Sequence, residues 1–438
     1  MKVKNKGWKC IFLLSFLCLC LFLQPNPVLS STLINREEYL RIVDTQNPTL
    51  LALVKQAKAK FSEVQSLVAH QRLAINLQTE NIVFTGSNKN EQTLSLNVLQ
   101  KIDIAGKYLP EEEYYLIEYE KSIFQYKDEK NKILAQAEKA FWEAAWAKEN
   151  VELQKNILYE RLELLKVAQE KYKQGMVPEL DVIRASTQVE ESRSFLTEAE
   201  AFFQNALTSM NVLATNQHLN MIPETALSSL SISTSSVLSV NSSTIELILA
   251  NRDDLNILNL TLRQLELSRI LAAKGLSPML EASLGYVALT DSEQKESLEG
   301  DIRLSLVMTV PIIDGQKSKL QQKQYEELIQ STHYNIQAKE TSIYQEVVEA
   351  QNDWEKSLAL EKSRKQQLDQ STRELAITRL MYQEGMGNQL DLLRAQVENQ
   401  RVQTEYLAAI RDVYKSLAEL KRVAGGYSHP ESGPDKES

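Results

Sequence analysis

The sequence predicts a mainly α-helical chain with a small antiparallel β part, in which a unit of one long helix and one β-hairpin occurs twice. Three observations predict this fold. Long stretches lack glycine and proline, which cost about 1 to 3 kcal/mol each inside a helix. Short segments between them alternate apolar and polar residues with the period of two that strands show. The same order of elements recurs further along the chain, which indicates a duplication.

The first 30 residues have the features of a secretory signal peptide. Four lysines precede an apolar run, Ile11–Leu23, which is shorter than the roughly 20 residues of a membrane-spanning helix. Pro25 and Pro27 end this run, and small residues suit cleavage after Ser30. An uncleaved anchor is the alternative. All three cysteines lie in this segment, so we expect no disulfide and no thiolate metal site in the mature chain.

The duplication is clearest at two glycine-containing turns, where seven of fourteen positions match between residues 172–185 and 382–395. Coiled-coil composition alone does not explain a glycine and an aspartate that recur at the same spacing. The matched pairs are Tyr172 and Tyr382, Gly175 and Gly385, Met176 and Met386, Leu180 and Leu390, Asp181 and Asp391, Arg184 and Arg394, and Ala185 and Ala395.

This duplication predicts two repeats, at residues 31–224 and 245–424. A Ser/Thr-rich linker at 225–244 separates them, and a polar tail occupies 425–438. In the first repeat we expect strands at about 72–100 and a long helix at about 111–174, and in the second repeat strands at about 279–310 and a long helix at about 316–384.

Each predicted long helix measures roughly 100 Å at about 1.5 Å per residue. Shorter helices, each roughly 50 Å long, are expected after the turns and before the strands. The helices before the strands are expected at about 36–70 and 245–275. Two short helices therefore match one long helix in length. Two apolar stripes on the first long helix indicate a neighbour on each side, which favours a closed ring of helices over an ordinary bundle. The stripes are Leu153, Ile157, Leu164 and Ala168, and Leu158, Leu162 and Leu165.

The alternating segments at 280–288, 302–310 and 94–98, with a weaker one at 73–77, have the pattern of tilted membrane strands. A soluble hairpin packed on the helices is the alternative. Four strands cannot close a barrel, and unpaired backbone groups cost several kcal/mol each in lipid. Two copies give about eight strands and little open lumen. We therefore expect an oligomer, and specifically a trimer with twelve strands.

The remaining composition disfavours several classes of function. The chain carries a net charge of −9, and the segment to be removed contains only basic charges, so nucleic acid is not an expected partner. The sequence has no phosphate-binding glycine loop, metal-ligand cluster or nucleophile with its base. We therefore expect no enzyme activity, cofactor or metal. A periplasmic adaptor or structural protein built on helical hairpins remains the rival, although this chain has two hairpin units and little glycine outside the turns.

With these features, the chain resembles the TolC-type outer membrane efflux protein family. The resemblance is carried by the Tyr-x-x-Gly-x5-Asp turns at 172–181 and 382–391 and by the strand-to-helix stretches at 98–107 and 309–317. It implies a homotrimer in which an α-helical barrel joins a 12-stranded β-barrel in the outer membrane of a diderm bacterium, with a large periplasmic part. It also implies contact with outer membrane lipid, a periplasmic adaptor protein and an inner-membrane pump as partners, and a passive conduit for efflux or type I secretion.

The resemblance further implies that the two turns form a closed periplasmic gate. Asp181 and Tyr382 match family positions that help to hold such a gate shut, and Asp391 matches an acidic lining position. Gly387 and Arg394 depart from the family pattern. From the residues alone, Asp and Arg three positions apart share a helix face, so opposite charges would attract neighbouring turns; simple capping of the helix starts stays open. The candidate gate residues are Tyr172, Gly175, Asp181, Arg184, Tyr382, Gly385, Asp391 and Arg394.

Overall fold

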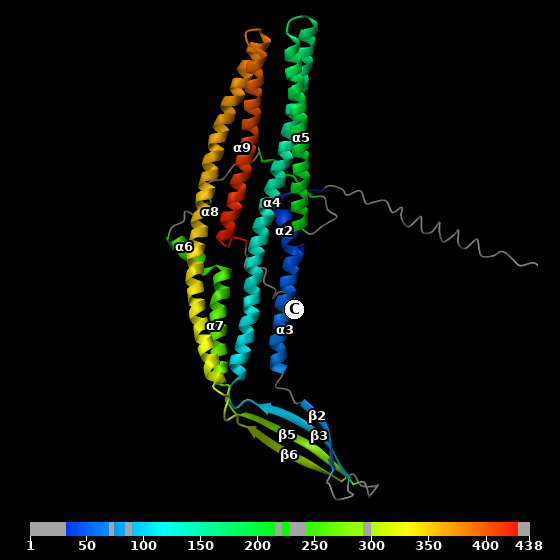
Figure 1. Ribbon diagram of the computed structural model, residues 1–438, viewed down its shortest axis with the longest axis vertical. Coiled ribbons are helices and arrows are strands. Elements are labelled where there is room, and N and C mark those ends of the chain that lie inside the picture. Colours follow the sequence, from blue (N-terminus) through cyan, green and yellow to red (C-terminus); the bar gives the residue numbers. More distant parts are fainter. Residues whose placement is uncertain are drawn as a thin grey trace, which may run out of the picture. The chain divides into compact units, whose positions relative to one another are not determined.

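The computed structural model describes residues 32–69, 74–83, 90–214, 221–227, 242–291 and 299–427 (Figure 1). The predicted signal peptide, most of the predicted linker and the tail beyond Tyr427 lie outside these residues. No helix within the described ranges has both the length and the apolar character needed to cross a membrane. The elements are β1 (Thr32–Ile34), α2 (Arg36–Gln46), α3 (Pro48–Ala69), β2 (Ala74–Val83), β3 (Asn90–Ile102), α4 (Tyr108–Lys173), α5 (Glu179–Leu213), β4 (Met221–Pro223), α6 (Ser242–Ala250), α7 (Asp253–Ala273), β5 (Met279–Asp291), β6 (Glu299–Thr309), α8 (Lys317–Gln383) and α9 (Gln389–Val423).

The two long helices, α4 and α8, confirm the predicted duplication. Helix α8 differs from its predicted bounds by one residue at each end. Helix α4 begins three residues earlier than predicted, because Pro110 lies in its first turn, where the N–H that proline lacks needs no helical partner. The Oδ2 atom of Asp103 accepts the backbone N–H of Tyr108 at 2.7 Å and so satisfies one donor at this helix start.

The two helices that precede the strands are each interrupted, whereas the sequence predicts single helices there. Asn47 separates α2 from α3, and its Oδ1 accepts the backbone N–H groups of Thr49 and Leu50 at 2.9 and 3.3 Å. Pro48 then starts α3, the position at which proline suits a helix. In the second repeat, Arg252 has an extended backbone and separates α6 from α7.

The chain divides into two compact units, which we call the turn unit and the sheet unit. The turn unit consists of the described residues within Met1–Val43, Ala140–Leu230 and Leu368–Arg411, and the sheet unit of those within Asp44–Lys139, Ser231–Gln367 and Asp412–Ser438.

In the sheet unit, the first part of α4 has neighbours on two sides. Helix α3 lies along it, with Lys60 Nζ 2.9 Å from Glu118 Oε1. Helix α7 contacts it through Arg263, whose Nη2 lies 2.7 Å from Glu113 Oε1. A separate apolar core is formed by residues of the four helices α6, α7, α8 and α9. It includes Ile248, Leu255, Ile343, Val347, Ala350, Trp354, Leu420 and Val423.

In the turn unit, the second part of α4 packs against α5 and α9. The Trp146 ring lies edge-on to Phe202 of α5, with centroids 5.3 Å apart. On α9, Arg411 Nη1 lies 3.2 Å from Glu143 Oε1. The first predicted stripe on α4 is buried or half-buried, whereas Leu162 of the second stripe is exposed. The turn unit also contains the parallel pair β1 and β4 and the fully buried Tyr39.

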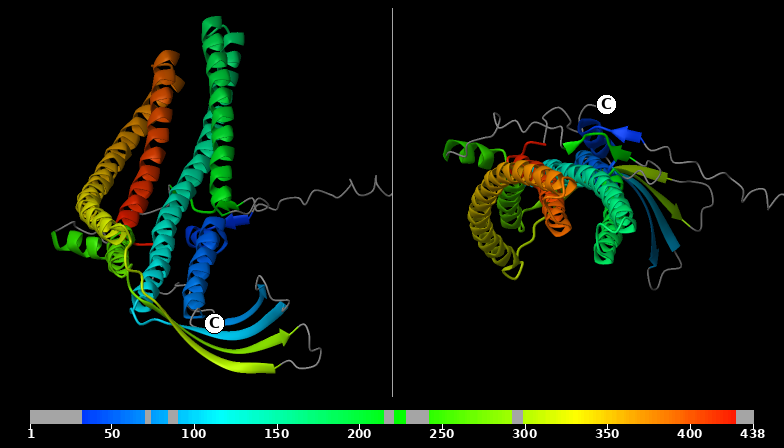
Figure 2. Two further views of the ribbon diagram at one scale, coloured as in Figure 1. Left: turned by 60° about the horizontal axis from the view of Figure 1, so that its bottom comes forward. Right: turned by 90° about the horizontal axis from the view of Figure 1, so that it is seen from above.

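The four long strands form one curved antiparallel layer in the order β2-β3-β5-β6 (Figure 2). Each hairpin belongs to one repeat, so β3 and β5 join the two repeats at the centre of the sheet. The predicted alternating segments are therefore confirmed as strands, and β2 and β6 are the edges of this sheet.

Candidate functional site

The sheet has one apolar face and one largely polar face. Residues that pair across an antiparallel ladder point to the same side of the sheet, so the register assigns whole rows to each face. Two rows on the apolar face are Ile75, Val98, Leu284 and Leu304, and Leu77, Leu96, Tyr286 and Ile302. The row between them, on the opposite face, is Asn76, Asn97, Gly285 and Arg303.

The apolar face is uncovered within the described chain. Ile302 is 80% exposed and Leu304 is 78% exposed. The edge strands β2 and β6 contain 10 and 11 residues, and each pairs with a described strand on only one side. Long edge strands with exposed apolar side chains invite pairing with another chain. The sheet is thus suited to lipid on one face and to further strands at both edges.

Each glycine turn closes the preceding long helix with the same hydrogen bonds. Gly175 and Gly385 have φ angles of 72° and 73°, in the left-handed region that glycine adopts at little cost. The N–H of Met176 donates to Lys171 O at 2.9 Å, and the N–H of Met386 donates to Met381 O at 2.9 Å. This is the Schellman pattern of helix ends. The prediction that helices end at these glycines is confirmed.

The next helices begin with the predicted aspartates. Asp181 and Asp391 are each the third residue of their helices, α5 and α9, where a carboxylate interacts favourably with the helix dipole. The two starts are capped differently. Asn388 Oδ1 accepts the N–H of Asp391 at 2.8 Å, whereas Pro178 stands at the equivalent position before α5 and provides no side-chain cap.

The turn unit brings Asp181 and Tyr382 into one electrostatic environment. Burial raises the pKa of the Tyr382 hydroxyl, and the charge of Asp181 raises it further. The Nζ of Lys171 lies 4.3 Å from the centre of the Tyr382 ring, within the range of a cation–π interaction. The Nε2 atom of Gln389 donates to Asp181 O at 3.0 Å and so links the two turns directly.

The remaining candidate residues are arranged less symmetrically. Arg184 Nη1 lies 3.6 Å from Asp181 Oδ1, but Asp391 and Arg394 form no ion pair in the described part of the chain. Arg184 and Arg394 instead line the same groove, of about 440 Å³, between α5 and α9. Tyr172 is exposed. The predicted attraction between oppositely charged turns is thus not seen within one chain.

Sequence reasoning missed Lys171 and Gln389, although both contact predicted gate residues. Their partners lie more than 200 residues away in the sequence, and no local pattern marks such a contact. Among the described residues, no group of histidine, cysteine, aspartate or glutamate side chains could hold a metal ion.

Residues 244–426 match the model of the family described as "Outer membrane efflux protein". No curated protein sequence matches the chain. Among solved structures, the open state of the Neisseria gonorrhoeae MtrE outer membrane channel is 18% identical with a TM-score of 0.76, covering 90% of this chain and 89% of that one. The Campylobacter jejuni CmeC outer membrane channel is 15% identical (TM-score 0.76, 92% and 88% covered). The Vibrio cholerae outer membrane protein VceC is 16% identical (TM-score 0.72, 89% and 96% covered).

This chain, with its four-stranded sheet and long helices, therefore has the fold of the TolC-type outer membrane channels. The second repeat of this chain, over residues 244–426, matches the model of the outer membrane efflux protein family. The resemblance seen in the sequence is thus confirmed. The matched family is one of efflux proteins, not of enzymes.

Proposed function

We propose that the chain is the outer membrane channel component of a tripartite efflux or type I secretion system. In this role it provides a passive conduit across the periplasm and the outer membrane. The observation that carries the proposal is the sheet, which combines an exposed apolar face with two unpaired edges. A single copy in water would expose both features, whereas a closed barrel in lipid would satisfy them.

We infer a homotrimer from the number of strands. Each chain supplies four long strands, and three chains supply the twelve that can enclose a passage. The apolar rows would then face lipid and the row containing Asn97 and Arg303 would face the lumen. This alternation is the rule in membrane β-barrels with a water-filled interior.

The proposed partners are a periplasmic adaptor protein and an inner-membrane pump. The family match of the second repeat supports a role in efflux. The cargo leaves no signature in the described residues, since a water-filled duct needs no dedicated binding site.

Two experiments test the channel. The proposal predicts that the protein fractionates with the outer membrane and that the purified oligomer opens stable ion-conducting pores in planar lipid bilayers. A periplasmic adaptor or structural protein would appear in the soluble periplasmic fraction and would leave the bilayer non-conducting. Either of these two outcomes would remove the channel proposal.

We further propose that the eight candidate residues form a gate at the two turns. The contacts of Asp181 with Arg184 and Gln389, and the position of Lys171 over Tyr382, support this role. Neutralising Asp181 would remove its ion pair with Arg184 on the same helix and its charge beside Tyr382 of the other turn, while the Gln389 hydrogen bond to its backbone oxygen would remain. A single exposed ion pair contributes only about 0 to 1 kcal/mol, but three copies would act on the same opening.

Bilayer conductance tests the gate. Asp181→Asn and Arg394→Gln channels are expected to open more often or conduct more than the parent. Arg193→Gln is a matched control, because Arg193 forms an exposed ion pair with Glu190 on α5, away from the turn. Conductance identical in all four proteins would show that these residues only cap and solvate the helix starts.

A further inference from the structure

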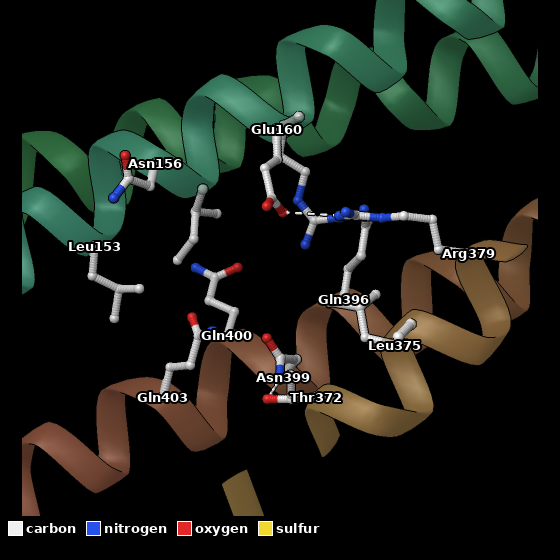
Figure 3. Close-up of a pocket in the computed structure, with 13 residues that line it drawn as sticks. Leu153, Asn156, Glu160, Thr372, Leu375, Arg379, Gln396, Asn399, Gln400 and Gln403 are labelled. Carbon is white, nitrogen blue, oxygen red and sulfur yellow. Dashed lines mark hydrogen bonds and ion pairs between the residues drawn. The ribbon is translucent and has the colours of Figure 1, made fainter. Parts of the chain in front are cut away.

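A polar pocket of about 370 Å³ lies between α4, α8 and α9 in the turn unit (Figure 3). Its charged lining residues are Glu160, Arg161 and Arg379, so the pocket carries an excess of positive charge. The other polar groups of its lining are neutral amides and one hydroxyl, including Gln396, Asn399 and Thr372. This composition differs from the apolar seam expected between packed helices.

Arg161 is the most unusual member of the pocket. It is only 3% exposed, and its Nη1 donates a hydrogen bond to Gln396 Oε1 on α9. No carboxylate lies within ion-pair distance of it in the part of the chain that the structure describes. Arginine keeps its proton in proteins, and a buried charge without a counter-charge is costly. Glu160 and Glu191 attract this guanidinium only from beyond ion-pair distance, and its hydrogen bond goes to a neutral amide.

Arg379 provides a second guanidinium at the rim of the same pocket. Its Nη2 lies 3.3 Å from Glu160 Oε2, and both side chains are about half exposed. This pair is visible as a dashed line in Figure 3. Because Glu160 already neutralises part of the charge of Arg379, it would compete with any anion that enters the pocket.

The amide groups of the pocket are held in place by their own contacts. Asn399 Nδ2 donates to Ser371 Oγ at 3.0 Å and to Thr372 Oγ1 at 3.2 Å. Gln400 Nε2 donates to Gln154 Oε1 at 3.3 Å. These contacts fix the walls contributed by α8 and α9, so the buried guanidinium faces a preformed polar cavity and not a collapsible gap.

We propose that this pocket binds a small oxyanion, a carboxylate or a phosphate, through the guanidinium groups of Arg161 and Arg379. The planar guanidinium fork matches both kinds of oxyanion and forms short, charge-assisted hydrogen bonds with them. A volume of this size accommodates a small organic acid as well as inorganic phosphate. The proposal goes beyond the conduit function, and it stands whether or not the protein conducts ions.

Isothermal titration calorimetry on the detergent-purified full-length oligomer tests the site. Succinate and inorganic phosphate serve as probes at constant ionic strength, with chloride as the reference salt. Saturable binding of at least one probe is expected, and the two titrations distinguish a carboxylate site from a phosphate site. Arg161→Gln is expected to weaken binding about tenfold or more, since hydrogen bonds to charged groups are among the strongest in proteins.

A second substitution is expected to change the affinity for the probe in the opposite direction. Glu160→Gln frees Arg379 and is expected to tighten binding several-fold. Glu160 is half exposed, so this variant tests the site even if Arg161→Gln fails to fold. Arg401→Gln is the matched control, because Arg401 pairs with Glu398 and Glu405 outside the pocket. This control variant should bind the probe with the same affinity as the parent.

Three outcomes would overturn the proposal. In the first, the parent shows no saturable binding of either probe, which is the result expected if a neighbouring copy fills the pocket. Arg161→Gln binds as tightly as Arg401→Gln. Glu160→Gln weakens the binding instead of strengthening it.

Discussion

At the scale of single residues, Gly175 and Gly385 make equivalent but independent contributions to the two turns. Both have positive φ angles, and nothing lies within 4 Å of the position that a Cβ atom would occupy. A side chain there therefore meets no steric obstacle from its surroundings. Any cost of a substitution comes from the backbone conformation alone.

Gly175→Ala is accordingly expected to destabilise its turn locally by about 1 kcal/mol, because left-handed backbone is unfavourable for alanine. This corresponds to about fivefold faster hydrogen–deuterium exchange in peptides that cover the end of α4 and the start of α5. Gly175→Asn should have a smaller effect, since asparagine tolerates this conformation better. Peptides of the Gly385 turn provide the internal control and should exchange as in the parent. Equal exchange of alanine variant and parent would contradict the prediction.

Residues whose role depends on local geometry could be predicted from the sequence, whereas residues whose role depends on contacts with distant parts of the chain could not. The glycines and aspartates of the turns could be predicted, since a helix end and a helix start each demand particular residue types. Arg161 could not be predicted as a pocket residue. It lies between Ile157 and Leu164 on an apolar stripe of α4, and only its charge hints at a different role.

At the scale of elements, the start of α7 shows two adjacent carboxylates with opposite behaviour. Burial raises the pKa of Asp253 to about 6. Burial also disfavours ionisation of Asp254, but hydrogen bonds from Arg252 and Lys339 outweigh it and hold the pKa of Asp254 at about 2. Arg252 is itself buried, with Nη2 2.7 Å from Asp254 Oδ2 and 3.3 Å from Glu346 Oε2.

These shifts predict opposite effects of pH on stability. The folded state binds the Asp253 proton more tightly than the unfolded state does, so the stability contributed by this group falls as pH rises from about 4 to about 6. Asp253→Asn should therefore gain stability relative to the parent over that interval. The measurement is the thermal unfolding temperature of the purified protein as a function of pH.

Asp254→Asn is the matched variant at the neighbouring position. The ionised Asp254 stabilises the fold above about pH 4, and this contribution disappears as pH falls towards 2. The variant should thus unfold at a lower temperature than the parent near pH 7, where it leaves buried Arg252 with one fewer partner. Parallel pH profiles for both variants and the parent would contradict the assigned ionisation states.

The elements themselves were largely predictable. Helices α5 and α9 begin at residues 179 and 389 and end at 213 and 423, as the duplication requires. The interruptions at Asn47 and Arg252 were not predicted, although a polar stretch marks each of them in the sequence, at 44–49, which includes Pro48, and at 251–254. The order of strands in the sheet could not be predicted from the sequence either. Strands β3 and β5 belong to different repeats, and no local signal specifies that they pair.

At the scale of the whole molecule, the apolar face of the sheet should determine whether the protein reaches a membrane. Leu304→Arg places a charge on that face and is expected to cost about 2 to 4 kcal/mol per chain near the centre of a bilayer. Ser305→Arg is the control, because the next residue along a strand points to the opposite face. The predicted result is loss of outer membrane assembly for Leu304→Arg and retention for Ser305→Arg, measured by fractionation and by gel mobility of the unheated oligomer. Equal loss or equal retention would argue against lipid on this face.

The strand order has a consequence for how copies can join. Neighbouring strands alternate in direction from β2 to β6, and four is an even number. The two outermost strands consequently run opposite to each other, so β6 of one chain can pair with β2 of the next without any parallel seam. The seam between chains then has the same polarity as the junction of β3 with β5 inside a chain. Each copy contributes two repeats of similar structure to such a ring, but the sequences of the two repeats are free to diverge. Arg161 in the first repeat, for example, corresponds to Ser371 in the second.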